Sequence, residues 1–159
     1  MPDMIVHLLN LPPLEPILIK MKRAGIVVRR AQPFEITQVR IFVEEHFQRS
    51  WADEIAVGYS NKPVSIFIAT RDGRIIGFAA YECTRRAFFG PMGVAESERG
   101  RGLGQSLLIA CLWGLREMGY VYGIIGGAGP TDFYARAVGA TIIERSEPGI
   151  YADPLKSSD

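Results

Sequence analysis

A short run rich in glycine and arginine, residues 99–104 (Arg-Gly-Arg-Gly-Leu-Gly), has the residue types and spacing of an anion-binding loop. It stands between an apolar, strand-like segment over 87–94 and an amphipathic, helix-like segment over 105–118, so it opens a helix whose first N–H groups have no intrahelical partner. Those N–H groups and the helix dipole favour an anion by about 0.3–1 kcal/mol, and by up to about 2 kcal/mol where the site is partly buried. Arg99 and Arg101 add two permanent positive charges. We therefore expect the loop to bind a ligand that carries a diphosphate.

The loop resembles the acetyl-CoA signature of the GNAT family of N-acetyltransferases, which reads Arg or Gln, two residues, Gly, one residue, and Gly or Ala. A bare Gly-x-Gly means little in a chain with 17 glycines among 159 residues, but here a strand-like segment precedes it and a helix-like segment follows it. The resemblance implies that backbone amides of the loop wrap the pyrophosphate of CoA. The implied acetyl-CoA-binding residues are Met92, Gly93, Val94, Arg99, Gly100, Arg101, Gly102, Gly104 and Gln105.

Tyr134 is the candidate proton donor. The pair Phe133-Tyr134, followed at helical distance by Gly139-Ala140, is similar to the closing motif of the same family, which implies that Tyr134 is the general acid. Aminolysis of a thioester expels a thiolate, and a phenol with a pKa of about 10 can protonate it while staying neutral at physiological pH. The other interpretation of Tyr134 is a tyrosine of the core or of the pocket wall.

The sequence does not single out a general base. A primary amine with a pKa near 10.4 must lose a proton before it attacks, which at pH 7 costs about 4.6 kcal/mol. Many GNAT enzymes use a Glu on the strand that corresponds to 87–94, and this segment has no carboxylate. Glu45, Glu54 and Glu82 are substitutes by approximate location, and each is equally a candidate for a solvated surface residue.

Gly90-Pro91 inside the predicted strand 87–94 indicates a bulge, because proline cannot donate to a sheet ladder. If this strand splays from its parallel neighbour there, the backbone groups of residues 92–94 face a cleft, and a ligand with amides, such as pantetheine, can pair with them. Three large aromatic residues either line an acceptor pocket or belong to the core; they are Trp51, Phe88 and Phe89.

Periodicity and turn residues predict the other elements. The predicted helices cover 34–47, 51–59, 105–118 and 130–138, and the predicted strands cover 26–30, 64–70, 74–81, 87–94, 121–125 and 140–144. Asp72-Gly73 predicts a hairpin, and the crossover helix makes strand 121–125 parallel to strand 87–94. The resemblance implies a mixed α/β, GNAT-like fold: a central, mostly antiparallel sheet of six to seven strands, with one parallel pair splayed to form the CoA cleft and about four flanking helices.

The chain length fits one domain. We expect residues 1–25 to be a proline-broken N-terminal extension with a short helix over 15–24, and residues 26–159 to be a single N-acetyltransferase domain. The extension packs either on its own domain or on a second copy of the chain, as a homodimer.

Composition and charge exclude several classes of function. A net charge of +1 does not indicate a basic surface that would bind nucleic acid. The two cysteines, Cys83 and Cys111, and the two histidines, His7 and His46, lack metal-ligand spacing, so we expect no metal. The apolar segment 4–11 is too short to span a bilayer, and we expect a cytoplasmic protein that does not enter a membrane.

Together these observations favour an acyltransferase that moves an acetyl group from acetyl-CoA to a primary amine of a small molecule or peptide, by direct attack in a ternary complex. One alternative is a non-catalytic CoA-binding module that kept the loop and lost its base. The other is an interaction protein that assembles through its apolar N-terminal segment, with the fold as scaffold.

Overall fold

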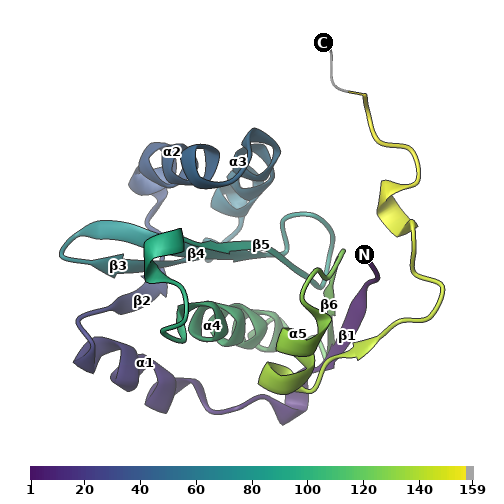
Figure 1. The fold of residues 1–159 in the computed structure, drawn as a ribbon, viewed down its shortest axis with the longest axis horizontal. Coiled ribbons are helices and arrows are strands. Elements are labelled where there is room, and N and C mark those ends of the chain that lie inside the picture. Colours follow the sequence, from purple (N-terminus) through teal and green to yellow (C-terminus); the bar gives the residue numbers. More distant parts are fainter. Residues whose placement is uncertain (157–159) are drawn as a thin grey trace.

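A seven-stranded sheet in the order β2-β3-β4-β5-β6-β1-β7 runs through the computed structural model, which describes residues 1–156 (Figure 1). Neighbouring strands are antiparallel except for the pair β5 and β6, which is parallel as predicted. The strands are β1 (Met4–His7), β2 (Val27–Arg30), β3 (Ile66–Arg71), β4 (Arg74–Tyr81), β5 (Phe88–Val94), β6 (Tyr122–Ile125) and β7 (Thr141–Ile142).

Five α-helices cover the two faces of the sheet, and Figure 1 shows α2 and α3 on one face and α1, α4 and α5 on the other. Their bounds are α1 (Leu14–Arg23), α2 (Ile36–His46), α3 (Arg49–Ala56), α4 (Leu103–Glu117) and α5 (Thr131–Val138). Each face has its own apolar core, and α4 is buried along most of its length because it packs under the middle of the sheet. Within residues 1–156 no helix combines the length and the apolar character needed to cross a bilayer.

The bulge predicted at Gly90-Pro91 is present and separates two halves of β5. Ala79 pairs with Met92 and Tyr81 pairs with Phe89. The partners are two residues apart on β4 and three residues apart on β5, so β5 contains one extra residue at this point. On its other side β5 pairs with β6 only at Phe88 and Phe89. Beyond the bulge the two parallel strands separate, and the second half of β5 has no partner strand on that side.

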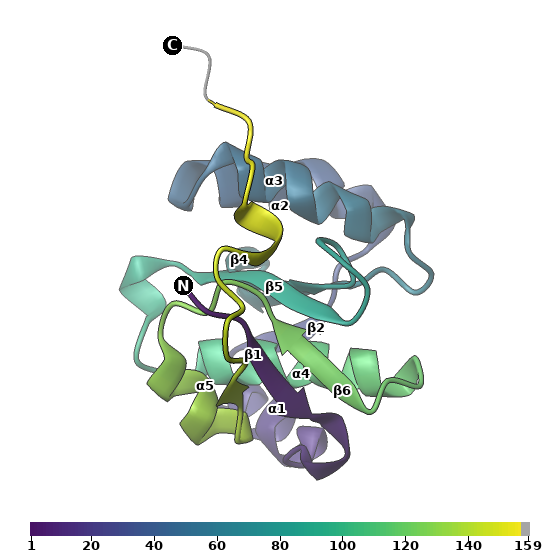
Figure 2. The same cartoon turned by 90° about the vertical axis from the view of Figure 1, so that its right-hand side faces the viewer.

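The first 25 residues, expected as an extension, supply a strand inside the sheet. Met4 pairs with Ile125 of β6 on one side and with Ile142 of β7 on the other. Met4 and Val6 are buried against the α4 face, which is the alternation expected of a half-buried strand. The sheet therefore depends on pairing between the two ends of the chain, as Figure 2 shows.

Candidate functional site

A cleft of about 640 Å³ opens between the second half of β5 and the start of α4. The structure brings eight of the nine residues predicted to bind acetyl-CoA to its walls: Met92, Gly93, Val94, Arg99, Gly100, Gly102, Gly104 and Gln105. The ninth, Arg101, is exposed beside the cleft, with Nη1 3.6 Å from Oε2 of Glu98. Pro130 and Phe133, at the start of α5, line the opposite wall.

The loop that leads into α4 has the conformation of an anion-binding turn. Gly100 and Gly102 both have φ near +81°, a region in which residues with a β-carbon are strained. Gly102 is the N-cap of α4, and among residues 1–156 no side chain caps this helix. The first hydrogen bond of the helix runs from the N–H of Ser106 to the carbonyl of Gly102. The N–H groups of residues 103–105 precede that bond and are free to bind an anion. Residues 99–102 are exposed, so the protein does not cover its own loop.

The register of β5 decides which backbone groups face the cleft. The N–H of Ala95 donates to Ile76, so by antiparallel alternation Gly93 and Phe78 form the next hydrogen-bonded pair. Met92 and Val94 therefore direct their N–H and C=O groups away from β4, toward the space that β6 leaves. Gly93 shapes the wall of the cleft in another way, because the absence of a side chain leaves room for the ring of Phe47.

Three charged side chains beside the loop, those of Arg71, Glu98 and Arg101, form one connected group. Oε2 of Glu98 accepts a hydrogen bond of 3.0 Å from Nη2 of Arg71 and also lies beside Arg101. Arg99 donates from Nε to the carbonyl of Val94 at 3.3 Å, which holds its stem along β5. Arg99 pairs with no carboxylate within the described part of the chain, so its charge is available to a ligand.

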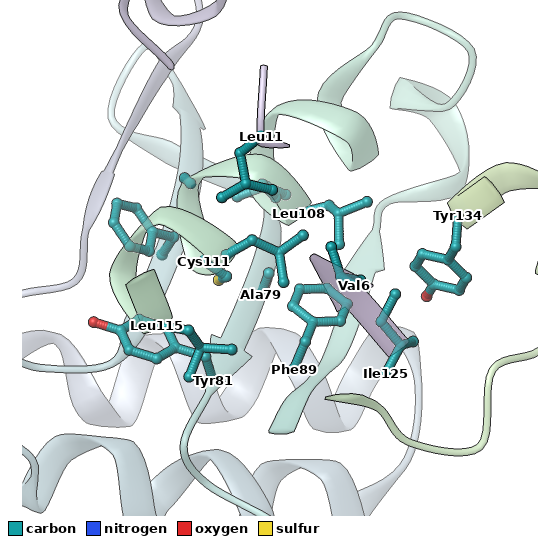
Figure 3. Packing of buried hydrophobic residues seen from close by; sticks show 14 of the residues in the cluster. Val6, Leu11, Ala79, Tyr81, Phe89, Leu108, Cys111, Leu115, Ile125 and Tyr134 are labelled. Atoms are coloured by element: carbon teal, nitrogen blue, oxygen red, sulfur yellow. The ribbon is translucent and has the colours of Figure 1, made fainter. Parts of the chain in front are cut away.

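Tyr134 lies on α5 at the edge of the core, where its ring packs edge-on against Phe89 and Phe133 with centroids 6.2 and 5.2 Å away. Figure 3 shows the ring beside Phe89 and Ile125. The side chain is 8% exposed, and this burial raises the pKa of Tyr134 to about 12. Tyr134 therefore belongs to the core, as one of the two interpretations of the sequence predicted, and it is not among the residues that line the cleft. Its phenol stays protonated at neutral pH.

A second cavity, of about 600 Å³, lies along the first half of β5, and Trp51 lines both cavities. The structure places Phe88 and Phe89 in its wall, so the aromatic residues singled out in the sequence lie here. Of the three candidate glutamates only Glu54 lines this cavity, where its carboxylate accepts a hydrogen bond from Thr84. Glu45 is exposed on α2, and the carboxylate of Glu82 accepts hydrogen bonds from Tyr120 and from the N–H of Ala87.

Sequence reasoning missed several residues that line these two cavities, among them Phe47, Thr84, Glu147 and Tyr151. Phe47 looked like the last apolar residue of a helix, and only its stacking on Trp51, at a centroid distance of 5.5 Å, brings it over the cleft. Tyr151 comes from the segment after β7, which crosses the sheet edge and runs toward α3 (Figure 2). No local pattern marks such a residue. Within residues 1–156 no three metal-binding side chains of the His, Cys, Asp or Glu type lie together.

Comparison with known proteins gives a family match and a set of fold relatives. Residues 62–137 match the model of the acetyltransferase (GNAT) domain. The glucosamine N-acetyltransferase region of a fungal multi-domain β-N-acetylglucosaminidase is similar at 20% identity, with a TM-score of 0.71 over 89% of this chain and 19% of that chain. A GCN5-related N-acetyltransferase from Sphaerobacter thermophilus is similar at 21% identity, with a TM-score of 0.65 over 89% of this chain and 48% of that chain.

A GNAT family acetyltransferase from Brucella melitensis, solved in complex with acetyl-CoA, has 20% identity and a TM-score of 0.56 over 70% of this chain and 80% of that chain. The chain spans only about a fifth of the fungal protein and about half of the Sphaerobacter protein. No curated protein matches the chain. At these identities the solved structures establish the fold alone, a mixed sheet with one splayed parallel pair. The match to the acetyltransferase (GNAT) domain covers slightly less than half of the chain.

Proposed function

We propose that this chain, in which residues 62–137 match the GNAT acetyltransferase domain, is a member of that family and transfers an acetyl group from acetyl-CoA to a primary amine by direct attack in a ternary complex. One observation carries this proposal: the uncapped, glycine-rich start of α4 opens on a cleft whose other wall is the unpaired half of β5. The cleft has the volume of a small-molecule site. A structural relative that holds acetyl-CoA supports the choice of co-substrate.

In this proposal the loop binds the diphosphate of CoA. The N–H groups of residues 103–105 supply donors at the positive end of the α4 dipole, and Arg99 supplies a full positive charge. Gly100 and Gly102 permit the turn that aims those donors outward. The backbone groups of Met92 and Val94 pair with the amides of pantetheine, as an added strand would.

The chemistry assigned to the protein is positioning and proton transfer. The N–H of Met92 donates to the thioester carbonyl oxygen as charge develops there, a contribution of about 2.7–4 kcal/mol per donor in other enzymes. As the amine nitrogen forms its bond to the carbonyl carbon, the C–S bond breaks and the thiolate leaves with the electron pair. Tyr134 gives that thiolate its proton. The nitrogen, which carries a positive charge after it attacks, loses a second proton to solvent as the amide forms, and the phenolate of Tyr134 regains a proton from solvent. The proton that the ammonium form loses before attack goes to solvent, directly or through a carboxylate of the second cavity.

Tyr134→Phe tests the catalytic part of the proposal. We expect a lower kcat with an unchanged Kd for CoA, because the substitution removes the proton donor and leaves the cleft intact. Tyr122→Phe is the matched control, since it removes the same hydroxyl from a tyrosine that is 52% exposed on β6 and packs against His7. A kcat equal to that of the wild type removes Tyr134 from the mechanism.

Calorimetry with CoA tests the binding part. We expect CoA to bind to the wild type, and Arg99→Ala to weaken it by about tenfold, which corresponds to about 1.4 kcal/mol. CoA binding without thiol release for any amine tested favours the non-catalytic CoA-binding module. The absence of CoA binding contradicts both functions.

A further inference from the structure

The second cavity adjoins the CoA cleft along one strand. Residues 88–91 of β5 line the second cavity and residues 92–94 line the cleft, while Trp51 lines both. A ligand in the second cavity therefore approaches the point on β5 where the thioester of the proposed complex would lie. The argument that follows rests on the proposed function and concerns the amine that this cavity accepts.

The charged groups that line this cavity have a net negative charge. Its lining includes two carboxylates, Glu54 and Glu147, and no Lys, Arg or His side chain among residues 1–156. Glu147 is paired with the amino group of Met1. Glu54 is half-buried and hydrogen-bonded to Thr84, and no cationic group of the described residues lies within ion-pairing distance of its carboxylate. The cavity thus offers an unpaired counter-charge for one ammonium group, whereas the cation in its lining, the amino group of Met1, is already paired with Glu147.

The remaining walls are largely apolar and aromatic. The rings of Trp51 and Phe88 both line the cavity, and rings of this kind bind both apolar groups and ammonium groups. Tyr151 completes the wall from the chain end: its ring lies against Gly127, with Cε2 3.4 Å from the position that a β-carbon on Gly127 would occupy. A side chain at position 127 would thus press on this ring.

Polar contacts hold that wall in place. The N–H of Asp3 donates to Oγ of Ser146 at 2.8 Å, and the carboxylate of Asp3 accepts a hydrogen bond of 2.8 Å from the N–H of Gly127. Asp3, which precedes β1, therefore connects the segment after β7 with the residues that follow β6. The cavity is bounded on this side, which favours a small free amine over a long peptide that would have to pass across it.

We propose that the second cavity is the acceptor site, and that it selects a small primary amine with an apolar or aromatic body and no acidic group. The ammonium form pairs with Glu54 on entry, and the body packs between the rings of Trp51 and Tyr151. Glu54 is assigned as a binding residue.

The experiment compares matched amines on the wild-type protein with acetyl-CoA. The test compound is 2-phenylethylamine, phenylalanine adds only a carboxylate, and phenylalaninamide has similar bulk without the negative charge. We expect kcat/KM for phenylalanine to be lower than for the other two by at least about tenfold, since one uncompensated charge readily costs 1.4 kcal/mol. Ethylamine, which lacks the apolar body, and putrescine, which replaces it with a second charge, should also be poorer substrates than 2-phenylethylamine.

Glu54→Gln keeps the size of the side chain and removes its charge. We expect KM for 2-phenylethylamine to rise by about tenfold and the discrimination against phenylalanine to shrink. Calorimetry of 2-phenylethylamine binding in the presence of CoA should show the same loss of affinity, without any turnover. Glu45→Gln is the control, because Glu45 is exposed on α2 and lines neither cavity.

Three results would overturn the inference: equal kcat/KM for phenylalanine and 2-phenylethylamine, preference for putrescine or a peptide lysine, or an unchanged amine affinity in Glu54→Gln. In each of these cases the protein still acetylates an amine or binds CoA, so the proposed function stands. Binding of CoA without thiol release for any compound, peptides included, contradicts the proposed acetyl transfer itself and this inference with it.

Discussion

The ring of Phe47 occupies the space that a side chain at Gly93 would need. A β-carbon built on Gly93 would lie 2.3 Å from Cζ of Phe47, a separation that real structures do not show. Phe47 is held there by Trp51 and Phe78, whose ring centroids are 5.5 and 5.7 Å away. The residue that follows α2 is thus packed onto the middle of the Met92-Gly93-Val94 segment, and it fixes the wall shared by the cleft and the α2 face.

Gly93→Ala should destabilise the protein by about 1–3 kcal/mol, because the methyl group must displace a ring that is packed against Trp51 and Phe78. Urea unfolding measures the change. The double variant Gly93→Ala with Phe47→Leu should be more stable than the sum of the two single changes predicts, since the smaller side chain makes room for the methyl group. Strict additivity would show that the two side chains do not compete for this space.

Gly102→Ala should weaken CoA binding, whereas Gly104→Ala should preserve it. Gly102 has φ +81°, where a β-carbon costs about 1–2 kcal/mol and pulls the loop from its conformation. Gly104 lies in the first turn of α4, and the nearest atoms to its added β-carbon are 3.8 Å or more away. In Gly104→Ala we expect helix stability to rise by up to about 1 kcal/mol. Calorimetry with CoA and urea unfolding of both variants check the contrast, which equal affinities would refute.

Glu98→Gln should lower stability and raise CoA affinity. The carboxylate of Glu98 is 17% exposed and pairs with Arg71, so its loss leaves a half-buried guanidinium without its partner, at about 1–3 kcal/mol. Glu98 also lines the cleft in which we place the phosphates. Two like charges about 8 Å apart in water repel by about 0.5 kcal/mol, so affinity should rise roughly twofold per phosphate charge. The gain should shrink in high salt, and a salt-independent change would argue against this cause.

Tyr134→Phe should change how stability depends on pH. Burial raises the pKa of Tyr134 to about 12 in the folded protein, against about 10 in the unfolded chain. Between pH 10 and pH 12 the unfolded chain has lost this proton while the folded protein keeps it, so stability falls as the pH rises. The two-unit difference corresponds to at most about 2.7 kcal/mol. Urea unfolding from pH 8 to pH 11 should show a steeper fall for the wild type than for Tyr134→Phe, and parallel curves would contradict the shift.

The elements and the loop were predictable because their causes are local. From residue 26 onward each predicted strand and helix is present, with ends shifted by a few residues. Glycine at 100 and 102 permits positive φ, and the pair Gly90-Pro91 forces a bulge wherever the strand pairs. The parallel pairing of β5 and β6 followed from the intervening helix α4, since such crossovers have one favoured geometry.

The sequence by itself therefore determined the strands and helices from β2 onward, the splay of β5 and the glycine-rich turn that opens α4. Only the tertiary structure decided that Met4 pairs with Ile125 and Ile142, that Phe47 covers Gly93, and that Tyr151 and Glu54 meet at one cavity. The physical reason is the range of the interactions. Backbone conformation and periodicity are set by neighbours along the chain, whereas these contacts join segments that come together only when the sheet and its two apolar cores are complete.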